Sequence, residues 1–233
     1  MLHAISGKKT RLYQRYLGHR EPGEKRVMEE DELTALLMGP LAFFSPGAVA
    51  CLWRTVVGSP TDWPEGEPSR ASVEFWPRRT VSRGYVEPDL LVSLHWDEGV
   101  RRLLLVEFKW RAPLSGERQL HNQWKDFLTP DERRQALHVF IAPEVSHGLN
   151  ALADEDVWDG RLLLRSWLDV LNGVQELKDN ADAPLGKWAR QIEAVLSLLQ
   201  IHPFRGFRSL VPPLSTPSAQ LGFWYGSDGK PGN

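Results

Sequence analysis

The chain contains one cysteine, Cys51, among 233 residues. A single thiol excludes an internal disulfide and any zinc site built from several cysteines. No apolar run approaches the roughly 20 residues that a membrane-spanning helix needs. The N-terminal segment MLHAISGKKT lacks the apolar core of a signal peptide. The sequence therefore predicts a protein of the reducing cytoplasm that does not associate with a membrane.

An excess of positive charge is also lacking, because 28 Lys and Arg are set against 30 Asp and Glu, for a net charge of −2. A protein that binds nucleic acid alone usually has a basic excess, since phosphate contacts dominate its affinity. Basic residues gather only locally, within 8–11, 78–83, 101–102, 133–134 and 205–208. We therefore expect any affinity for nucleic acid to come from a local patch or from a partner protein.

Several functional motifs are missing. The sequence has no internal repeat, no glycine-rich phosphate loop, and no Gly-x-Ser-x-Gly, His-Glu-x-x-His or Cys-x-x-Cys. Serine hydrolase, zincin and redox functions therefore lack support. The length predicts a single domain over residues 1–233. Within it, residues 1–26 are expected to form either a short helix or a loosely held arm, and residues 226–233 a disordered tail.

The most informative stretch is Glu87–Lys109, EPDLLVSLHWDEGVRRLLLVEFK. Residues 90–96 are apolar and aromatic, as in a strand. Residues 97–99 are turn formers, and Gly99 is free to adopt a positive φ. The continuous apolar run at 103–106 is typical of a strand buried on both faces. The stretch therefore predicts a hairpin of two buried strands.

The register of this hairpin brings charged residues together. If the loop occupies 97–99, counting outward along both strands places Asp89 opposite Glu107 on one face. Period-two alternation brings Lys109 to that face and turns Phe108 away. Facing acids destabilise a sheet unless something offsets their charge, and carboxylate oxygens are the ligands that Mg²⁺ prefers. The pattern therefore predicts a metal site; the alternative is a turn-initiating Pro-Asp and a solvated Glu-x-Lys.

Pro88-Asp89, followed after a hydrophobic strand by Glu107-Phe108-Lys109, resembles the PD-(D/E)xK nuclease superfamily, in particular its bacterial members. The resemblance implies a restriction-endonuclease-like fold and Mg²⁺-dependent cleavage of phosphodiesters, with Mn²⁺ able to substitute. It also implies that Asp89 and Glu107 hold the metal, that the Phe108 carbonyl adds a ligand, and that Lys109 assists the attacking water.

A helix is predicted before the hairpin, over residues 28–44, with acids in its first turn and a break at 39–40. Members of the superfamily commonly carry a further acid on such a helix. By this resemblance Glu30 is expected to be the third acid near the metal, with Asp31 or Glu32 as substitutes. The alternative is that all these acids only stabilise the N-terminus of the helix through its dipole.

A second amphipathic helix is predicted after the hairpin, within residues 116–127, because Leu120, Trp124 and Phe127 recur at helical spacing. Gln119 and Gln123 are four residues apart and share a face. The resemblance implies that a glutamine on this helix lies beside the metal site, and it does not decide between the two.

The remaining pattern predicts a three-layer α/β/α sandwich around a mixed sheet of about five strands. Further strands are expected at 72–76, 136–142 and 161–167, and helices at 146–154, 167–171 and 184–200. Residues 48–57 fit either a helix or a strand, and 221–225 either a terminal strand or a docked tail. His138 is expected to be a hydrogen-bonded core histidine, whereas Trp110 near the site could stack on bases.

Two functions follow from this sequence. The first is a metal-dependent nuclease acting on DNA rather than RNA, with endo- or exonuclease action left open; the resemblance also implies a subunit of bacterial defence against foreign DNA. The second is a nuclease-fold subunit that serves as a non-catalytic interaction or scaffolding module in a larger nucleic-acid-processing complex. The mildly acidic charge and the many aromatic residues motivate this alternative. The oligomeric state is left open.

Overall fold

The computed structural model describes residues 1–19, 29–58, 63–82, 84–110, 114, 116 and 118–203. Met1–Pro203 forms one compact unit by itself. The expectations for residues 221–225 and 226–233 lie outside the described residues. In the predicted N-terminal segment 1–26, residues 1–19 contain two short helices, α1 (Leu2–Ser6) and α2 (Tyr13–Tyr16), and residues 20–26 lie outside the described residues.

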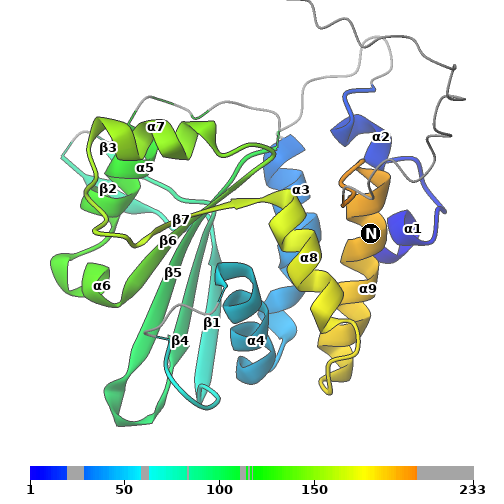
Figure 1. The fold of residues 1–233 in the computed structure, drawn as a ribbon, viewed down its shortest axis with the longest axis horizontal. Helices are drawn as coiled ribbons and strands as arrows, with labels where there is room; N and C mark the ends of the chain where they lie inside the picture. The colour runs from blue at the N-terminus through cyan, green and yellow to red at the C-terminus, as the bar shows by residue number, and fades with distance from the viewer. Residues whose placement is uncertain are drawn as a thin grey trace, which may run out of the picture. The chain divides into compact units, whose positions relative to one another are not determined.

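A five-stranded mixed sheet forms the centre of this unit, in the order β1-β4-β5-β6-β7 (Figure 1). Its strands are β1 (Arg70–Phe75), β4 (Leu90–His95), β5 (Arg101–Phe108), β6 (Ala136–Ala142) and β7 (Leu162–Ser166). β1, β4 and β5 pair antiparallel, whereas β5, β6 and β7 pair parallel. The predicted α/β class and mixed five-stranded sheet are confirmed.

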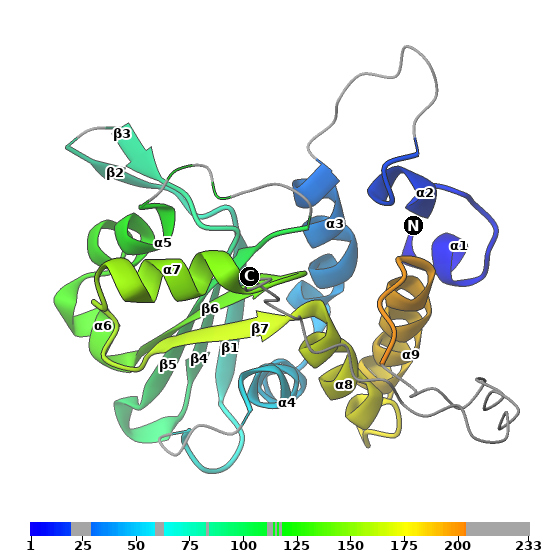
Figure 2. The ribbon, with the colours of Figure 1, turned by 45° about the horizontal axis from the view of Figure 1, so that its top comes forward.

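Helices cover both faces of the sheet, which is consistent with a three-layer arrangement (Figures 1 and 2). On one side lie α3 (Glu29–Met38), η1 (Gly39–Phe43), α4 (Pro46–Val57), α8 (Trp167–Leu177) and α9 (Ala183–Leu198). On the other lie α5 (Gln119–Asn122), the π-helical turn η3 (Gln123–Phe127), α6 (Pro130–Gln135) and α7 (Ser146–Asp154).

Alternation along the strands separates two hydrophobic cores. In β5, Leu104, Val106 and Phe108 belong to the core beneath α3, α4, α8 and α9. Leu103 and Leu105 belong to the core beneath α5 and α7. Successive side chains of a strand point to opposite faces, so a continuously apolar strand fills both cores.

The structure identifies residues 46–57 as a helix and corrects the end of α8. Ser45 caps α4 by accepting from Ala48 N–H, and Gly58 ends it at φ 77°. The helix predicted to stop at residues 172–173 continues to Leu177, so that prediction is wrong. A Cβ on Gly173 would lie 2.9 Å from Thr55 Cγ2. The glycine therefore permits close packing of α8 on α4 instead of breaking the helix.

A small hairpin between β1 and β4 was not predicted. It consists of β2 (Arg79–Val81) and β3 (Gly84–Val86), which pair antiparallel in a separate sheet beside α5 (Figure 2). Arg79 fastens it by a bidentate contact with Glu132 on α6, at 2.7 and 2.8 Å. Among the described helices, none is long and apolar enough to cross a membrane.

Candidate active site

The predicted hairpin register is confirmed by the β4–β5 pairing. Trp96 N–H donates to the Val100 carbonyl at 2.8 Å, and Gly99 adopts φ 78° in the turn η2 (Asp97–Gly99). The pairing runs without interruption from His95 and Arg101 to Leu90 and Val106. One further step along each strand reaches Asp89 and Glu107. Within the paired residues, no bulge interrupts this register.

Asp89 closes the end of the hairpin. Its Oδ2 accepts the Phe108 N–H at 2.7 Å, so the carboxylate binds the backbone of the opposite strand. The Phe108 ring points to the other face and stacks on Trp167, with ring centroids 5.7 Å apart. The predicted alternation of side chains therefore holds at the strand end. A metal-binding role for the Phe108 carbonyl stays a prediction.

Glu107 is surrounded by donors on both carboxylate oxygens. Lys109 Nζ and Gln119 Nε2 each lie 2.7 Å from its Oε1. Gln123 Nε2 donates to Oε2 at 2.6 Å. Gln119 and Gln123 therefore both contact the Glu107 carboxylate, because each binds a different oxygen.

Of the three acids considered on α3, Glu30 is the one that reaches this cluster. Its Oε1 lies 2.7 Å from Lys109 Nζ, and its Oε2 accepts the Trp110 N–H at 3.0 Å. Glu32 instead interacts with Tyr16, where burial first and Glu32 second raise the pKa of the phenol to about 12. Glu30 therefore contacts the lysine of the site.

The backbone that carries Lys109 is held firmly. Its N–H donates to the Ile141 carbonyl at 2.7 Å, and its carbonyl accepts from Trp167 Nε1 at 2.8 Å. Trp110 Nε1 donates to the Tyr16 carbonyl at 2.6 Å, and the Trp110 side chain is buried. The prediction that Trp110 could stack on bases is therefore wrong, because its ring is part of the core.

Burial governs the charges of the cluster. Burial and then the neighbouring Glu107 charge raise the pKa of Asp89 well above its ordinary value. Burial also raises the pKa of Glu107, although Lys109 and Gln123 oppose that shift. Burial would lower the pKa of Lys109, but Glu107 and Glu30 outweigh it and raise that pKa. Lys109 is therefore a cation at neutral pH. Any further positive charge nearby would favour the ionised forms of Asp89 and Glu107.

The carboxylate oxygens of the site fit a Mg²⁺ ion that takes only a few of its ligands from the protein. Asp89 uses only Oδ2 for Phe108, and Glu107 Oε2 accepts only from Gln123 among the described contacts, so each carboxylate retains lone pairs. Mg²⁺ commonly binds one or two carboxylates and keeps several waters. Within the described ranges, no group of three or more His, Cys, Asp and Glu is arranged to hold a metal. Asp89 and Glu107 are therefore the pair that could hold the ion, while Glu30 is engaged by Lys109.

Two residues near the site were not predicted to take part in it. His138 on β6 is a hydrogen-bonded core histidine, as predicted, but its partner is Gln123. Trp158, between α7 and β7, donates from Nε1 to His138 at 2.9 Å. The only signal in the sequence was a histidine within an otherwise apolar strand, and nothing local connects it to Gln123.

Comparisons with protein-family models, curated proteins and solved structures found no match to this chain. The functional argument therefore depends on the site itself.

Proposed function

We propose that this chain is a Mg²⁺-dependent nuclease of the PD-(D/E)xK type, with a restriction-endonuclease-like fold, that hydrolyses phosphodiester bonds of DNA. The observation that carries the proposal is the cluster of Asp89, Glu107 and Lys109 at the end of the β4–β5 hairpin. Its two acids have raised pKa values, and its lysine lies 2.7 Å from Glu107. Buried groups with pKa values perturbed by burial and charge partners are typical of catalytic sites.

Asp89 and Glu107 would hold the metal. Bound Mg²⁺ supplies a Lewis acid that lowers the pKa of water and stabilises negative charge on a phosphate. Lys109, being protonated, donates hydrogen bonds to the attacking water or to a phosphate oxygen and does not act as a base. Gln119 and Gln123 orient Glu107, and Glu30 orients Lys109.

The test uses the purified full chain with supercoiled plasmid, linear duplex DNA, single-stranded DNA and RNA, in Mg²⁺ or Mn²⁺. We expect DNA cleavage that EDTA abolishes. Asp89→Ala, Glu107→Ala and Lys109→Ala should each lower the rate by about 100-fold or more, the scale of losing one electrostatic group of an active site. Circular dichroism and thermal unfolding would show that each variant remains folded.

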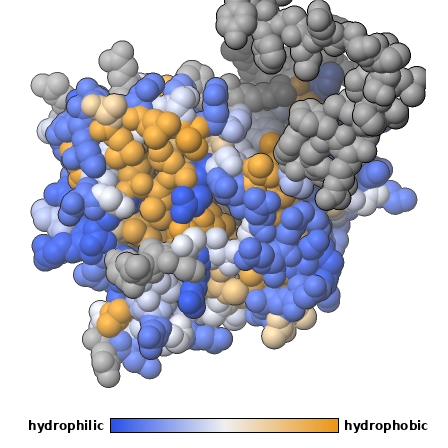
Figure 3. Space-filling view, in the orientation of Figure 1, coloured by the Kyte–Doolittle hydropathy of each residue, from blue (hydrophilic) through white to orange (hydrophobic). Residues whose placement is uncertain are grey.

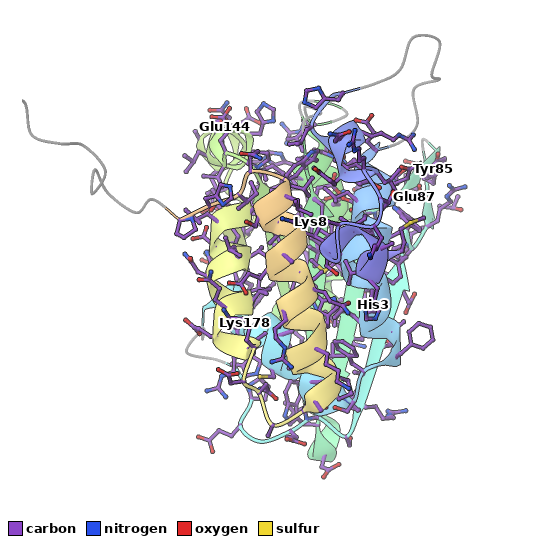
Figure 4. All side chains as sticks on the ribbon, turned by 90° about the vertical axis from the view of Figure 1, so that its right-hand side faces the viewer. His3, Lys8, Tyr85, Glu87, Glu144 and Lys178 are labelled. Carbon is purple, nitrogen blue, oxygen red and sulfur yellow. The ribbon has the colours of Figure 1, made fainter. Side chains whose placement is uncertain are left out.

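Glu144→Ala is the matched control, because Glu144 is an exposed carboxylate at the surface (Figure 4). It should cleave at the wild-type rate. A fully active Glu107→Ala protein would overturn the proposed mechanism. Comparison of DNA with RNA tests the DNA preference, which rests on the sequence resemblance. A role in bacterial defence against foreign DNA is proposed on the same ground.

A second candidate is a non-catalytic interaction module in a larger nucleic-acid-processing complex. The observation that favours it is that apolar side chains gather on the face over α7 and β7 (Figure 3). On α7, Leu149 is 55% exposed. Large apolar patches commonly mark protein interaction sites. Cleavage by the isolated chain would exclude a purely non-catalytic role, whereas inactivity on every substrate would favour it.

A further inference from the structure

Three buried side chains lead from Glu107 into the core beneath α7. Gln123 Nε2 donates to Glu107 Oε2 at 2.6 Å. The Oε1 of the same glutamine lies 3.2 Å from His138 Nε2. Trp158 Nε1 lies 2.9 Å from His138 Nδ1. Gln123, His138 and Trp158 are each at most 1% exposed; we refer to these three residues as the positioning series.

The donor-only indole sets the direction of every hydrogen bond in this series. Because Trp158 Nε1–H can only donate, His138 Nδ1 must accept. A neutral imidazole then carries its proton on Nε2, which donates to Gln123 Oε1. The remaining end of the glutamine is its NH₂ group, which therefore faces Glu107. The hydrogen-bond order that starts at Trp158 thus requires Gln123 to donate to the carboxylate.

The opposite orientation of Gln123 would be costly. It would place the amide oxygen against Glu107 Oε2 and an NH₂ group against His138 Nε2–H, so that two buried pairs would lose their hydrogen bonds. A buried polar group without a partner is destabilising, because it has lost its hydrogen bonds to water and gained none in the protein. Burial also lowers the pKa of His138 to about 3, with His121 adding to the shift, so the ring stays neutral. Trp124 stacks on that ring at 6.0 Å with an interplanar angle of 5°, which holds it in place.

We propose that Trp158 and His138 are positioning residues that fix the amide orientation of Gln123 and thereby hold Glu107 in the geometry needed for a divalent cation. The cation-binding part of this inference rests on the proposed nuclease function. The hydrogen-bond order does not, because it follows from the donors and acceptors of the buried residues alone.

The first test reads the hydrogen-bond order directly by NMR of the full chain labelled with ¹⁵N. We expect His138 to be the neutral tautomer protonated on Nε2. Trp158→Phe, which removes the indole donor and leaves a smaller aromatic ring, should convert it to a mixture of tautomers. His138→Phe, which retains an aromatic ring against Trp124, should shift and broaden the side-chain amide signals of Gln123. A wild-type His138 protonated on Nδ1, or unmoved Gln123 signals in His138→Phe, would overturn the proposal.

The second test measures binding of Mn²⁺ alone by calorimetry. His138→Phe should weaken binding by about 10-fold, at the lower end of the 10–100-fold range for residues that support metal ligands. His138→Gln, whose amide can again donate to Gln123, should restore most of that affinity. Unchanged Mn²⁺ affinity in His138→Phe would refute a role in holding Glu107.

His121→Phe is the matched control for loss of a buried histidine. His121 is 1% exposed, its Nε2 contacts the Glu155 carbonyl at 2.9 Å, and its ring packs on Trp158 with centroids 4.8 Å apart, an aromatic contact that phenylalanine keeps. Among the described contacts, His121 makes no hydrogen bond to Glu107, Gln123 or His138. This variant should bind Mn²⁺ within about twofold of wild type and leave the His138 tautomer unchanged, even where it lowers thermal stability. An equal loss of affinity in both variants would indicate a general packing effect and overturn the positioning role.

The two tests separate failure of this inference from failure of the proposed function. If the wild-type chain neither binds Mn²⁺ nor cleaves DNA, the nuclease proposal fails, and so does the cation-binding part of the inference. The NMR experiment still decides whether Trp158 and His138 orient Gln123. If the wild-type chain binds Mn²⁺ and His138→Phe binds it equally well, the nuclease proposal stands and the positioning role is wrong.

Discussion

At the scale of single residues, Asp89 and Glu107 accept hydrogen bonds from different numbers of donors. Glu107 accepts from Lys109, Gln119 and Gln123, whereas Asp89 accepts from one backbone N–H. Both side chains are at most 8% exposed. A buried carboxylate with one donor is costly to ionise. Without a cation, Asp89 is therefore the acid that most destabilises the ionised site.

This difference predicts the effect of Asp89→Asn on stability in EDTA. The pKa of Asp89 is raised in the folded chain, so the folded chain retains a proton where the unfolded chain has released it. Stability is therefore greatest at low pH and falls as pH rises from the unfolded pKa of about 4 to the folded value. Asparagine avoids this loss and can still accept from Phe108. Asp89→Asn should raise the melting temperature at pH 7.5, and the gain should vanish below about pH 4.

Thermal scans in EDTA between pH 3.5 and 8 would measure this effect. Asp97→Asn is the control, because Asp97 is an exposed carboxylate in the turn of the same hairpin. It should leave the melting temperature nearly unchanged at every pH. A lower melting temperature for Asp89→Asn at pH 7.5 would mean that the ionised Asp89 stabilises the metal-free fold.

At the scale of elements, close contacts between helices place the site. α8 begins at Trp167, whose indole donates to the Lys109 carbonyl, and packs on α4 at Gly173. The α8–α4 contact requires glycine at position 173, since a Cβ there would be 2.9 Å from Thr55 Cγ2. Thr55 Oγ1 itself donates to the Cys51 carbonyl at 2.9 Å, which limits its freedom to rotate away.

A double-mutant cycle would test this contact. Gly173→Ala gains helix propensity but meets the Thr55 methyl group, whereas Thr55→Ser removes that methyl group and keeps the hydroxyl. We expect Gly173→Ala to be more favourable in the Thr55→Ser background by about 0.5–2 kcal/mol, measured by urea unfolding. Additive effects, within about 0.3 kcal/mol, would show that the two positions do not interact energetically. Gly39→Ala is a control without such a neighbour, because a Cβ at residue 39 would meet no described atom within 4 Å.

At the scale of the whole molecule, a cation at the site should stabilise the entire fold. Asp89 directly precedes β4 and Glu107 lies in β5, and these two strands pair antiparallel in the central sheet, so binding energy there is linked to global unfolding. A ligand at about 100 times its dissociation constant adds about 2.7 kcal/mol. In a domain of this size each kcal/mol raises the melting temperature by about 2–4 °C.

We therefore expect saturating Mn²⁺ or Mg²⁺ to raise the melting temperature of the full chain by about 5–10 °C, and EDTA to reverse the rise. Asp89→Asn should lose most of the shift, because one of the two proposed ligands is no longer charged. An equal shift in wild type and Asp89→Asn would place the cation elsewhere on the molecule.

The sequence by itself determined the hairpin and the grouping of Asp89, Glu107 and Lys109. Strand alternation and a glycine-containing turn are local properties, so they set register and face without reference to the rest of the chain. It also determined the five-stranded mixed sheet and the bounds of α7, since periodicity and turn residues mark them.

Only the tertiary structure decided which distant side chains meet there. It selected Glu30, 79 residues from Lys109, placed both glutamines on Glu107, and joined His138 to Gln123. It also buried Trp110 and carried α8 past Gly173. These outcomes depend on how helices pack on the two faces of the sheet. The spacing of side chains along one segment does not predict that packing, because the contacts join elements far apart in sequence.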